Sequence, residues 1–286
     1  MSANTTETKK KSGYSFEVFP PKKEDEFPKA YEVLDALKTL SPDFISVTYG
    51  AGGSRSKSTA ELASYIQNKL KLNALAHMTC VGCRKEALLE VCRQLKECNI
   101  KNILALRGDR PKDMTDEQFA ARDFEYASEM ITFLKEHTDF SIAAACYPEK
   151  HFESFSMESD LNHLKEKQEA GASFLITQMF FDNDLFYAFR EKLAKKGITL
   201  PVHAGIMPIT AAKQLGTTVS LSGASIPNAL SQLIAAYGDN PQDMYQAGVN
   251  YAVRQIKDLQ ANGVSDIHIY TMNKPDLAET IIASLK

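Results

Sequence analysis

The sequence predicts an α/β fold of one kind, a (β/α)8 or TIM barrel with eight parallel strands. Eight short apolar runs of strand length alternate with segments whose apolar residues recur at helical spacing. In six of these runs the last one or two positions carry a side chain able to do chemistry, as expected of a barrel whose active site lies where its strands end. The 286 residues also fit one barrel of about 250 residues.

Each predicted strand ends in a polar residue or a Gly/Pro turn, either of which can end a strand. Alternation places Ser15, Glu17 and Phe19 on one face of the first strand, opposite the apolar residues between them. We expect this polar face to point into the barrel or its mouth, because helices cover the other face. In chain order the strands are Tyr14–Phe19, Asp43–Tyr49, Asn73–Thr79, Ile103–Asp109, Ser141–Tyr147, Phe174–Met179, Pro201–Gly205 and Asp266–Tyr270.

Amphipathic segments between these runs predict the helices. Each segment has one apolar side, which suits a helix packed on the outside of a barrel. The segment Ile206–Asn240 is richer in Ser, Gly and Pro, and it predicts short helices inserted after the seventh strand. No linker interrupts the alternation, so we expect a flexible tail at residues 1–12 and a single catalytic domain at residues 13–286. The clearest helical stripes begin at Phe27, Leu88, Phe124 and Val249.

Composition and charge argue against several classes of protein. With a net charge of −3 and a pI of about 6.1, the chain has no basic face for nucleic acid. No apolar run approaches the ~18 residues of a membrane span, and the polar start lacks the apolar core of a secretory signal. We therefore expect a cytoplasmic protein that binds neither nucleic acid nor membranes.

The five cysteines are an odd number in a large domain, which indicates reduced thiols. Cys80 and Cys83 form one C-x-x-C, whose functional readings are a redox pair or half of a zinc site. We favour free thiols, because no second C-x-x-C follows. We expect no metal centre and no serine hydrolase, since the H-E-x-x-H and G-x-S-x-G motifs are also absent.

Glu17 is the sharpest candidate for catalysis. Its carboxyl group stands among Phe16, Val18 and Phe19 and is followed by two prolines, so we expect it to be poorly solvated. Loss of hydration disfavours the charged form and raises the pKa toward the range in which the group donates a proton near neutrality. The structural alternative is a glutamate paired with an interior arginine such as Arg107.

Two other polar groups each allow a functional and a structural reading. Arg107 and Asp109 close the fourth strand, where they either contact one polar ligand or form a salt bridge across the barrel mouth. Asp160, His163 and Lys167 share one face of the helix after the fifth strand. Taken alone, that face is more simply a solvated, charged stripe.

A glycine-rich turn, Gly50-Ala51-Gly52-Gly53-Ser54, resembles a phosphate-cradling loop. It is not the dinucleotide fingerprint G-x-G-x-x-G, because Arg55 stands where the third glycine belongs. A dinucleotide would therefore be bound in some other way. His151 and His203 are single histidines, and residues of this kind are more often structural than ligands.

Together these residues resemble the methylenetetrahydrofolate reductase family, the flavin-dependent barrel enzymes of one-carbon metabolism. Nine short motifs follow one another in the family's order and span nearly the whole chain. They are Ser15–Pro21, Val47–Ala51, His77–Cys80, Leu106–Asp109, Tyr147–Glu149 with His151, the Asp160–Lys167 stripe with Ala170–Ala172, Thr177–Asp182, Gly205–Pro208 and Tyr270–Asn273.

The resemblance implies a single-barrel, bacterial-type enzyme with non-covalent FAD across the mouth and NADH or NADPH as electron donor. In two half-reactions, the flavin is reduced and then passes hydride to 5,10-methylenetetrahydrofolate, giving 5-methyltetrahydrofolate. Glu17 would be the general acid and Asp109 a catalytic residue near flavin and pterin. The family also suggests a homo-oligomer.

The resemblance also assigns binding residues. Those expected at the flavin are Thr48, His77, Arg107, Gly108, Asp109, Ala127, Tyr147, His151, Asp160, His163 and Lys167. Those expected at the folate or nicotinamide are Glu17, Thr48, Asp109, Gln178, Tyr270 and Lys274.

Two positions depart from the family pattern. Lys274 stands where some relatives have an arginine for the folate tail, and lysine lacks the planar fork of arginine. Ala212 stands where some have a phenylalanine near the folate. Two other functions remain open: a lyase or aldolase with Glu17 as base, and an idle barrel that binds folate or stores flavin. The choice between NADH and NADPH is also open.

Overall fold

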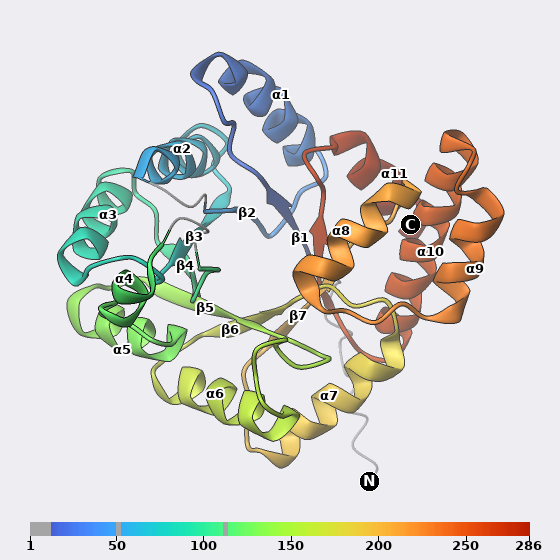
Figure 1. Ribbon diagram of the computed structural model, residues 1–286. Helices are drawn as coiled ribbons and strands as arrows, with labels where there is room; N and C mark the ends of the chain where they lie inside the picture. The colour runs from blue at the N-terminus through green and yellow to red at the C-terminus, as the bar shows by residue number, and fades with distance from the viewer. Residues whose placement is uncertain (1–12, 50–52, 111–113) are drawn as a thin grey trace, which may run out of the picture.

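The computed structural model describes residues 13–49, 53–110 and 114–286, in which eight parallel strands close into a barrel (Figure 1). The strands pair in chain order, and β8 returns to pair with β1, which confirms the predicted (β/α)8 fold. The tail expected at 1–12 and the glycines of the turn at 50–52 lie outside the described residues. The strands are β1 (Gly13–Val18), β2 (Phe44–Val47), β3 (Asn73–Thr79), β4 (Asn102–Leu106), β5 (Ser141–Cys146), β6 (Phe174–Thr177), β7 (Val202–Ile206) and β8 (Asp266–Tyr270).

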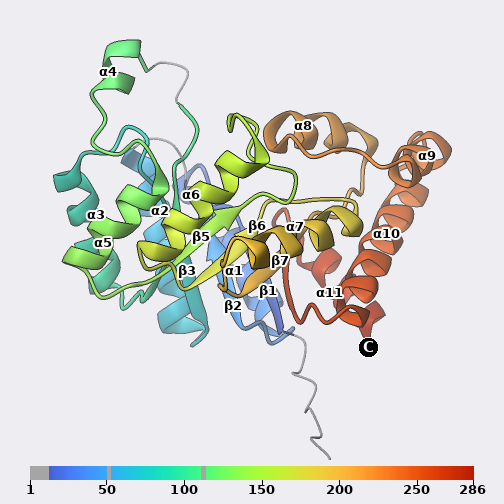
Figure 2. The same ribbon diagram turned by 90° about the horizontal axis from the view of Figure 1, so that it is seen from below.

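Helices surround the barrel, and Figure 2 shows the short α4 standing away from it at the end of a loop. Two helices, α8 and α9, separate β7 from α10, as predicted. The helices are η1 (Glu24–Glu26), α1 (Phe27–Lys38), α2 (Gly53–Ser64), η2 (Tyr65–Lys69), α3 (Lys85–Glu97), α4 (Asp116–Ala120), α5 (Ala127–His137), α6 (Met157–Glu169), α7 (Asn183–Lys195), α8 (Ala212–Ser222), α9 (Asn228–Tyr237), α10 (Pro241–Ala261) and α11 (Pro275–Leu285). Within the described ranges, no helix is both long and apolar enough to cross a membrane.

Several boundaries differ from the prediction. The fourth strand ends at Leu106, so Arg107 and Asp109 belong to the loop that follows it. Gly108, with a φ of +83°, turns the chain there, which a strand residue could not do. The helix expected from Phe124 begins three residues later at Ala127, although the Phe124 ring is buried. In each case the apolar pattern continues beyond the regular hydrogen bonding, because loop residues also pack against the core.

Apolar side chains pack against both faces of the strands, outward against the helices and inward in the barrel. Phe16 and Val18 point outward into the main core between strands and helices. A smaller cluster of Leu75, Leu104, Ala143 and Ile176 lies on the opposite, inward-facing side of the strands. The barrel is therefore closed by hydrocarbon over part of its length, and polar side chains share the interior with this plug.

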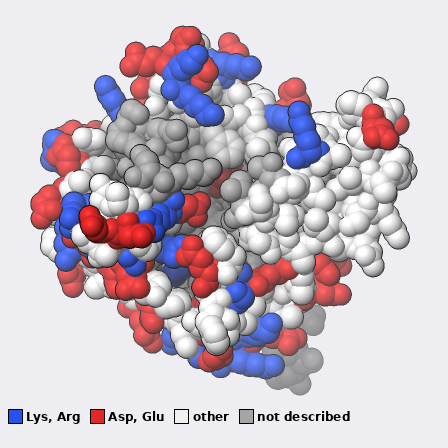
Figure 3. Space-filling model, in the orientation of Figure 1, with Lys and Arg blue, Asp and Glu red and all other residues white. Residues whose placement is uncertain are grey.

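The two sides of the mouth differ in charge. Charged side chains crowd the side formed by α3 to α6, whereas the surface over α8 and α9 is nearly free of them (Figure 3). From Ala212 to Tyr237 the sequence has one charged residue, Lys213. Leu230 and Leu233 of α9 instead join an apolar cluster that includes Tyr270 of β8. Cations for an anionic ligand therefore come from the opposite side.

Candidate active site

Glu17 lies at the carboxyl end of β1, and only 12% of its side chain is exposed. Backbone pairing sets it beside Ser46 of β2 and Tyr270 of β8. Its Oε2 lies 3.5 Å from His77 Nε2 and 3.7 Å from His268 Nε2. The carboxyl group therefore meets two imidazoles from different strands, inside the barrel wall.

A second set of contacts fixes His268, which is fully buried. Its Nδ1 lies 2.8 Å from Ser15 Oγ, and its Nε2 lies 3.5 Å from Ser46 Oγ. A hydrogen-bonded chain thus runs from Ser15 through His268 toward Glu17. Sequence analysis missed His268, although the alternation of Asp266, His268 and Tyr270 marks a polar face on β8.

Burial controls the charges of this cluster. Desolvation raises the pKa of Glu17, while it lowers the pKa of His77 to about 4 and that of His268 to about 3. A protonated His77 would lower the pKa of Glu17, but at neutral pH both imidazoles are uncharged. The glutamate therefore has no compensating cation among them, which favours its protonated form. The low solvation predicted for Glu17 is confirmed.

The alternative pairing of Glu17 with Arg107 is wrong. Arg107 Nη1 instead lies 2.5 Å from Oε2 of Glu153, in the loop between β5 and α6. Its Nε is buried and has no hydrogen-bond partner. Next to it, a Cβ on Gly108 would approach Thr79 Cβ to 2.8 Å, so only glycine fits. Asp109, exposed, follows at the rim. The loop after β4 thus presents a guanidinium with an unused donor.

Asp160 and Lys167 do not form the solvated stripe that their spacing alone favoured. Asp160 is 5% exposed, and its carboxylate accepts hydrogen bonds from the His151 backbone N–H at 3.3 Å and from Ser154 Oγ at 3.1 Å. Lys167 Nζ donates to the Ala145 carbonyl at 2.9 Å. Desolvation lowers the pKa of Lys167. The pair faces the barrel wall near Cys146 and supports the loop that carries His151.

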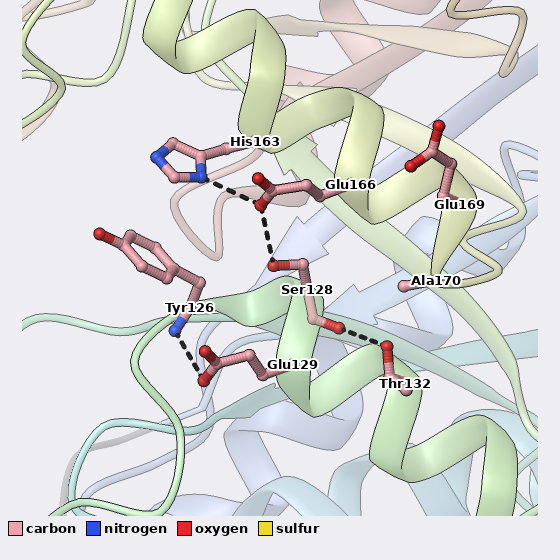
Figure 4. Close-up of a pocket in the computed structure, with 8 residues that line it drawn as sticks. All are labelled: Tyr126, Ser128, Glu129, Thr132, His163, Glu166, Glu169 and Ala170. Carbon is pink, nitrogen blue, oxygen red and sulfur yellow. Dashed lines mark hydrogen bonds and ion pairs between the residues drawn. The ribbon is translucent and has the colours of Figure 1, made fainter.

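His163, the third member of that stripe, lies elsewhere. It lines a cleft of about 620 Å³ between α5 and α6 (Figure 4). Its ring stacks on Tyr126 with centroids 4.5 Å apart, and its Nδ1 lies 3.1 Å from Glu166 Oε2. Ala127, buried, begins α5 beside Tyr126. The flat pair of rings and the nearby carboxylate form a polar cleft with an aromatic wall.

The remaining predicted residues surround the mouth. Tyr270 is buried and donates its hydroxyl to the Thr177 carbonyl at 2.7 Å. Gln178 follows that carbonyl directly and is partly exposed. Tyr147, which follows β5, contacts the His151 ring edge-on at 4.7 Å. Thus Glu17 and Tyr270 lie on adjacent strands, and Tyr270 links them to the end of β6.

Three further predicted positions complete the rim. Thr48 follows β2, and its backbone N–H donates to the Val18 carbonyl at 3.0 Å. Lys274 is exposed and precedes α11, while Ala212 begins α8. None of these three contacts Glu17 through a described hydrogen bond. Thr48 directly follows β2 and Lys274 lies just beyond β8, the two strands that pair with β1.

The cysteines form no disulfide. All five are free thiols, as expected, and burial raises the pKa of Cys80 to about 12. Thiolates are the reactive form, so Cys80 is inert at neutral pH. Among the described residues, no three His, Cys, Asp or Glu side chains gather as a metal site would require.

Comparison with known proteins identifies the family of this chain. The family model described as methylenetetrahydrofolate reductase matches residues 2–286. The chain belongs to the methylenetetrahydrofolate reductase family. It is 34% identical to the 5,10-methylenetetrahydrofolate reductase of Escherichia coli over 271 residues, which are 95% of this chain and 90% of that protein. The chain is therefore an enzyme of this family.

Two further comparisons concern a yeast relative and a solved structure. Methylenetetrahydrofolate reductase 1 of Schizosaccharomyces pombe is 35% identical over 97% of this chain, which matches 46% of the yeast protein. Among solved structures, an uncharacterized protein from Clostridium thermocellum that binds two copies of 5-methyl-5,6,7,8-tetrahydrofolic acid superposes with a TM-score of 0.62. It is 12% identical and covers 97% of this chain and 95% of its own, so this likeness shows the shared barrel fold alone.

Proposed function

We propose that this enzyme reduces 5,10-methylenetetrahydrofolate to 5-methyltetrahydrofolate, with NADH or NADPH as electron donor and FAD as hydride carrier. Membership of the family supports the substrate. The observation that carries the mechanism is Glu17, a carboxyl group at the barrel mouth whose pKa burial raises, beside two neutral histidines.

Glu17 acts as the general acid. It donates its proton to a ring nitrogen of the folate's five-membered ring, and the bond from that nitrogen to the one-carbon unit breaks. The one-carbon unit becomes an iminium that can accept hydride. Burial raises the pKa of the carboxyl and so favours its protonated form, and the neutral His77 and His268 beside it add no charge that would favour its ionisation.

The residues of the α3–α6 side fit FAD. Arg107 offers a buried N–H without a partner, and Lys167 adds a second cation. Gly108 lets the loop that carries Arg107 turn tightly against Thr79, where a Cβ would clash. Lys167 and Arg107 would hold the pyrophosphate, with Thr48, His77, Asp109, Ala127, Tyr147, His151, Asp160 and His163 around the rest of the flavin. Once bound, FAD carries hydride from the nicotinamide to the folate.

The substrates take turns at the same place, in a ping-pong reaction. NAD(P)H leaves after its hydride has been transferred, and methylenetetrahydrofolate then enters beside Glu17. Gln178 would contact each in turn, because it follows β6 next to the Thr177–Tyr270 hydrogen bond. Thr48, Asp109, Tyr270 and Lys274 would complete the folate site. The free thiols fit a reducing cytoplasm, and we expect a homo-oligomer, which light scattering would test.

The decisive experiment separates the two half-reactions. Under anaerobic conditions NADH or NADPH should bleach the flavin of the loaded protein, and methylenetetrahydrofolate should restore its colour. Glu17→Gln should spare bleaching and slow recolouring by about 10²- to 10⁴-fold, because only the second step needs the donated proton. Glu97→Gln, on the surface of α3, is the matched control.

The pH dependence gives an independent check. The protonated form of Glu17 is the active one, so the recolouring rate should fall as pH rises through its raised pKa. The bleaching rate should not show this fall. If Glu17→Gln slowed both half-reactions equally, Glu17 would not be the general acid. A protein that binds no flavin would instead favour the lyase, and one that bleaches but never recolours would favour the idle barrel.

A further inference from the structure

The end of β1 is held by side chains where the β-ladder stops. The last register pair between β1 and β8 is Glu17 with Tyr270. Beyond it, Thr271 Oγ1 donates to the Glu17 carbonyl at 2.7 Å. The Asn273 carboxamide then makes two hydrogen bonds with Phe19: its Oδ1 accepts from the Phe19 N–H at 2.8 Å, and its Nδ2 donates to the Phe19 carbonyl at 2.9 Å. We call these three hydrogen bonds the Thr271–Asn273 clamp.

The clamp pairs backbone groups at the end of β1 that the β-ladder leaves without partners. On the β2 side, the last backbone bond is from Thr48 N–H to the Val18 carbonyl, one residue short of Phe19. Pro20 and Pro21 follow, and since proline has no backbone N–H they cannot extend the ladder. Both polar backbone groups of Phe19 therefore bond to the one side chain of Asn273. Without it, the chain would be free to fray beyond Val18.

The backbone that carries the Asn273 side chain has an unfavourable conformation. Met272 and Asn273 have φ angles of 53° and 55°, two consecutive non-glycine residues in the left-handed region. Asparagine tolerates this region, but methionine does so rarely. Met272 packs against the apolar cluster around Tyr270 that lies under α8 and α9. Strain of this kind persists mainly at functional sites, where the surrounding structure enforces it.

We propose that Asn273 is a positioning residue for the folate half-reaction, which holds the end of β1 so that the Glu17 carboxyl stays in place beside His77 and His268. The proposal rests on Glu17 being the acid of the proposed function. The same two bonds fix Phe19, a residue that is 38% exposed and stands two positions after Glu17. Asn273 therefore acts through the backbone of its neighbour strand, without touching the substrate.

Two variants test the proposal. Asn273→Gly removes both hydrogen bonds but keeps easy access to the left-handed backbone, and Asn273→Asp keeps only the acceptor for the Phe19 N–H. We expect Asn273→Gly to slow flavin recolouring by methylenetetrahydrofolate about 10- to 100-fold, with Asn273→Asp between it and the wild type. Bleaching by NAD(P)H should stay within about twofold, since it needs no proton from Glu17.

The matched control is Asn99→Gly. Asn99 is also a left-handed asparagine, with a φ of 59° and one side-chain hydrogen bond to Asn68, but it lies in the turn between α3 and β4, at the opposite end of the barrel. Asn99→Gly should leave both half-reactions unchanged. Equal slowing of both half-reactions in Asn273→Gly, or a recolouring rate within twofold of the wild type, would overturn the proposal.

A second readout does not depend on turnover. In protein carrying ¹³C at glutamate carboxyl carbons, the Glu17 signal is assigned as the one lost in Glu17→Gln. Fraying of β1 admits water, so the pKa of Glu17 in Asn273→Gly should move down toward its ordinary value. An unchanged titration would contradict the proposal. If wild-type protein never recolours, the proposed function fails, whereas this titration still tests the clamp.

Discussion

At the scale of single residues, three ionisable side chains share one buried place. Glu17, His77 and His268 come from β1, β3 and β8, and loss of hydration shifts the pKa of each toward its uncharged form. A salt bridge would have fixed Glu17 as a carboxylate. Two uncharged imidazoles leave it able to give up a proton, and this is the property that the proposed reaction needs.

The buried histidines make a prediction about acid stability. The pKa of His268 falls from an ordinary 6.5 to about 3 on folding, so the unfolded chain binds the extra proton first as pH drops. Its contribution to stability is complete above pH 6.5 and is lost as pH falls toward 3, at up to about 1.4 kcal/mol per pH unit. His268→Asn should make the urea-unfolding free energy less steep between pH 6.5 and 5.

Only the slope is compared, because Asn also changes the hydrogen bonds to Ser15 and Ser46. His137→Asn, at the exposed end of α5, is the control and should keep the wild-type slope. An identical slope in His268→Asn and wild type would show that His268 is already protonated, or exposed to solvent, in the folded protein.

At the scale of elements, hydrogen bonds that involve side chains connect β6, β7 and β8. The Gly205 N–H of β7 donates to Thr177 Oγ1 at 2.8 Å, and Tyr270 of β8 donates to the Thr177 carbonyl. A Cβ on Gly205 would overlap that carbonyl and lie 2.8 Å from Tyr270 Oη. Only a glycine lets the Tyr270 ring cross β7, and this crossing orients the strand that also carries His268.

Gly205→Ala should therefore destabilise the barrel. We expect a loss of about 1–3 kcal/mol in the free energy of unfolding, because the methyl group has no space and its obstacle is backbone. Urea denaturation followed by circular dichroism measures it. Gly216→Ala on α8 is the control: nothing lies within 4 Å of its Cβ, so it should gain up to about 1 kcal/mol. Similar effects of the two variants would contradict the close packing at Gly205.

At the scale of the whole molecule, the barrel separates charge from hydrocarbon at its mouth. Arg107 follows β4 and Lys167 lies on α6, both on the α3–α6 side. The other side is covered by α8 and α9, which carry one charged residue, Lys213 (Figure 3). The overall charge of −3 offers no long-range attraction for an anion, so binding of the proposed FAD would depend on these local cations.

FAD should accordingly stabilise the whole fold. At a free concentration 100 times its Kd, a ligand of the folded state adds about 2.7 kcal/mol, which corresponds to a rise of about 5 °C in Tm. Differential scanning fluorimetry measures the shift, and riboflavin, which lacks the pyrophosphate, should give a much smaller one. Lys167→Met should lower the FAD shift.

Lys165→Met is its matched control, because Lys165 lies on the same helix and also donates to a carbonyl, that of Gly197. It should keep the FAD shift of the wild type. Equal shifts with riboflavin and FAD would show that the cations of this site do not bind the pyrophosphate.

The local pattern of the chain predicted much of this molecule. The eight strands, the outer helices and the insertion after β7 follow from apolar periodicity and turn residues, which act over a few positions. The low solvation of Glu17 was predicted from its apolar neighbours, but Phe16 and Val18 point outward, and Glu17 is buried on the opposite face of the strand beside His77 and His268. Strand ends were less accurate, because Arg107 and Asp109 continue the pattern after the chain has left the sheet.

The sequence by itself determined the barrel, the family and the residue to test first, because these depend on periodicity and on short motifs in order. Only the tertiary structure decided what surrounds Glu17. Ser15 and His268 stand 253 positions apart and meet because the last strand closes the barrel against the first. The same closure pairs Asn273 with Phe19. Arg107 pairs with Glu153 of the loop after β5, and not with Glu17. Such contacts depend on register around a closed sheet, which no local pattern encodes.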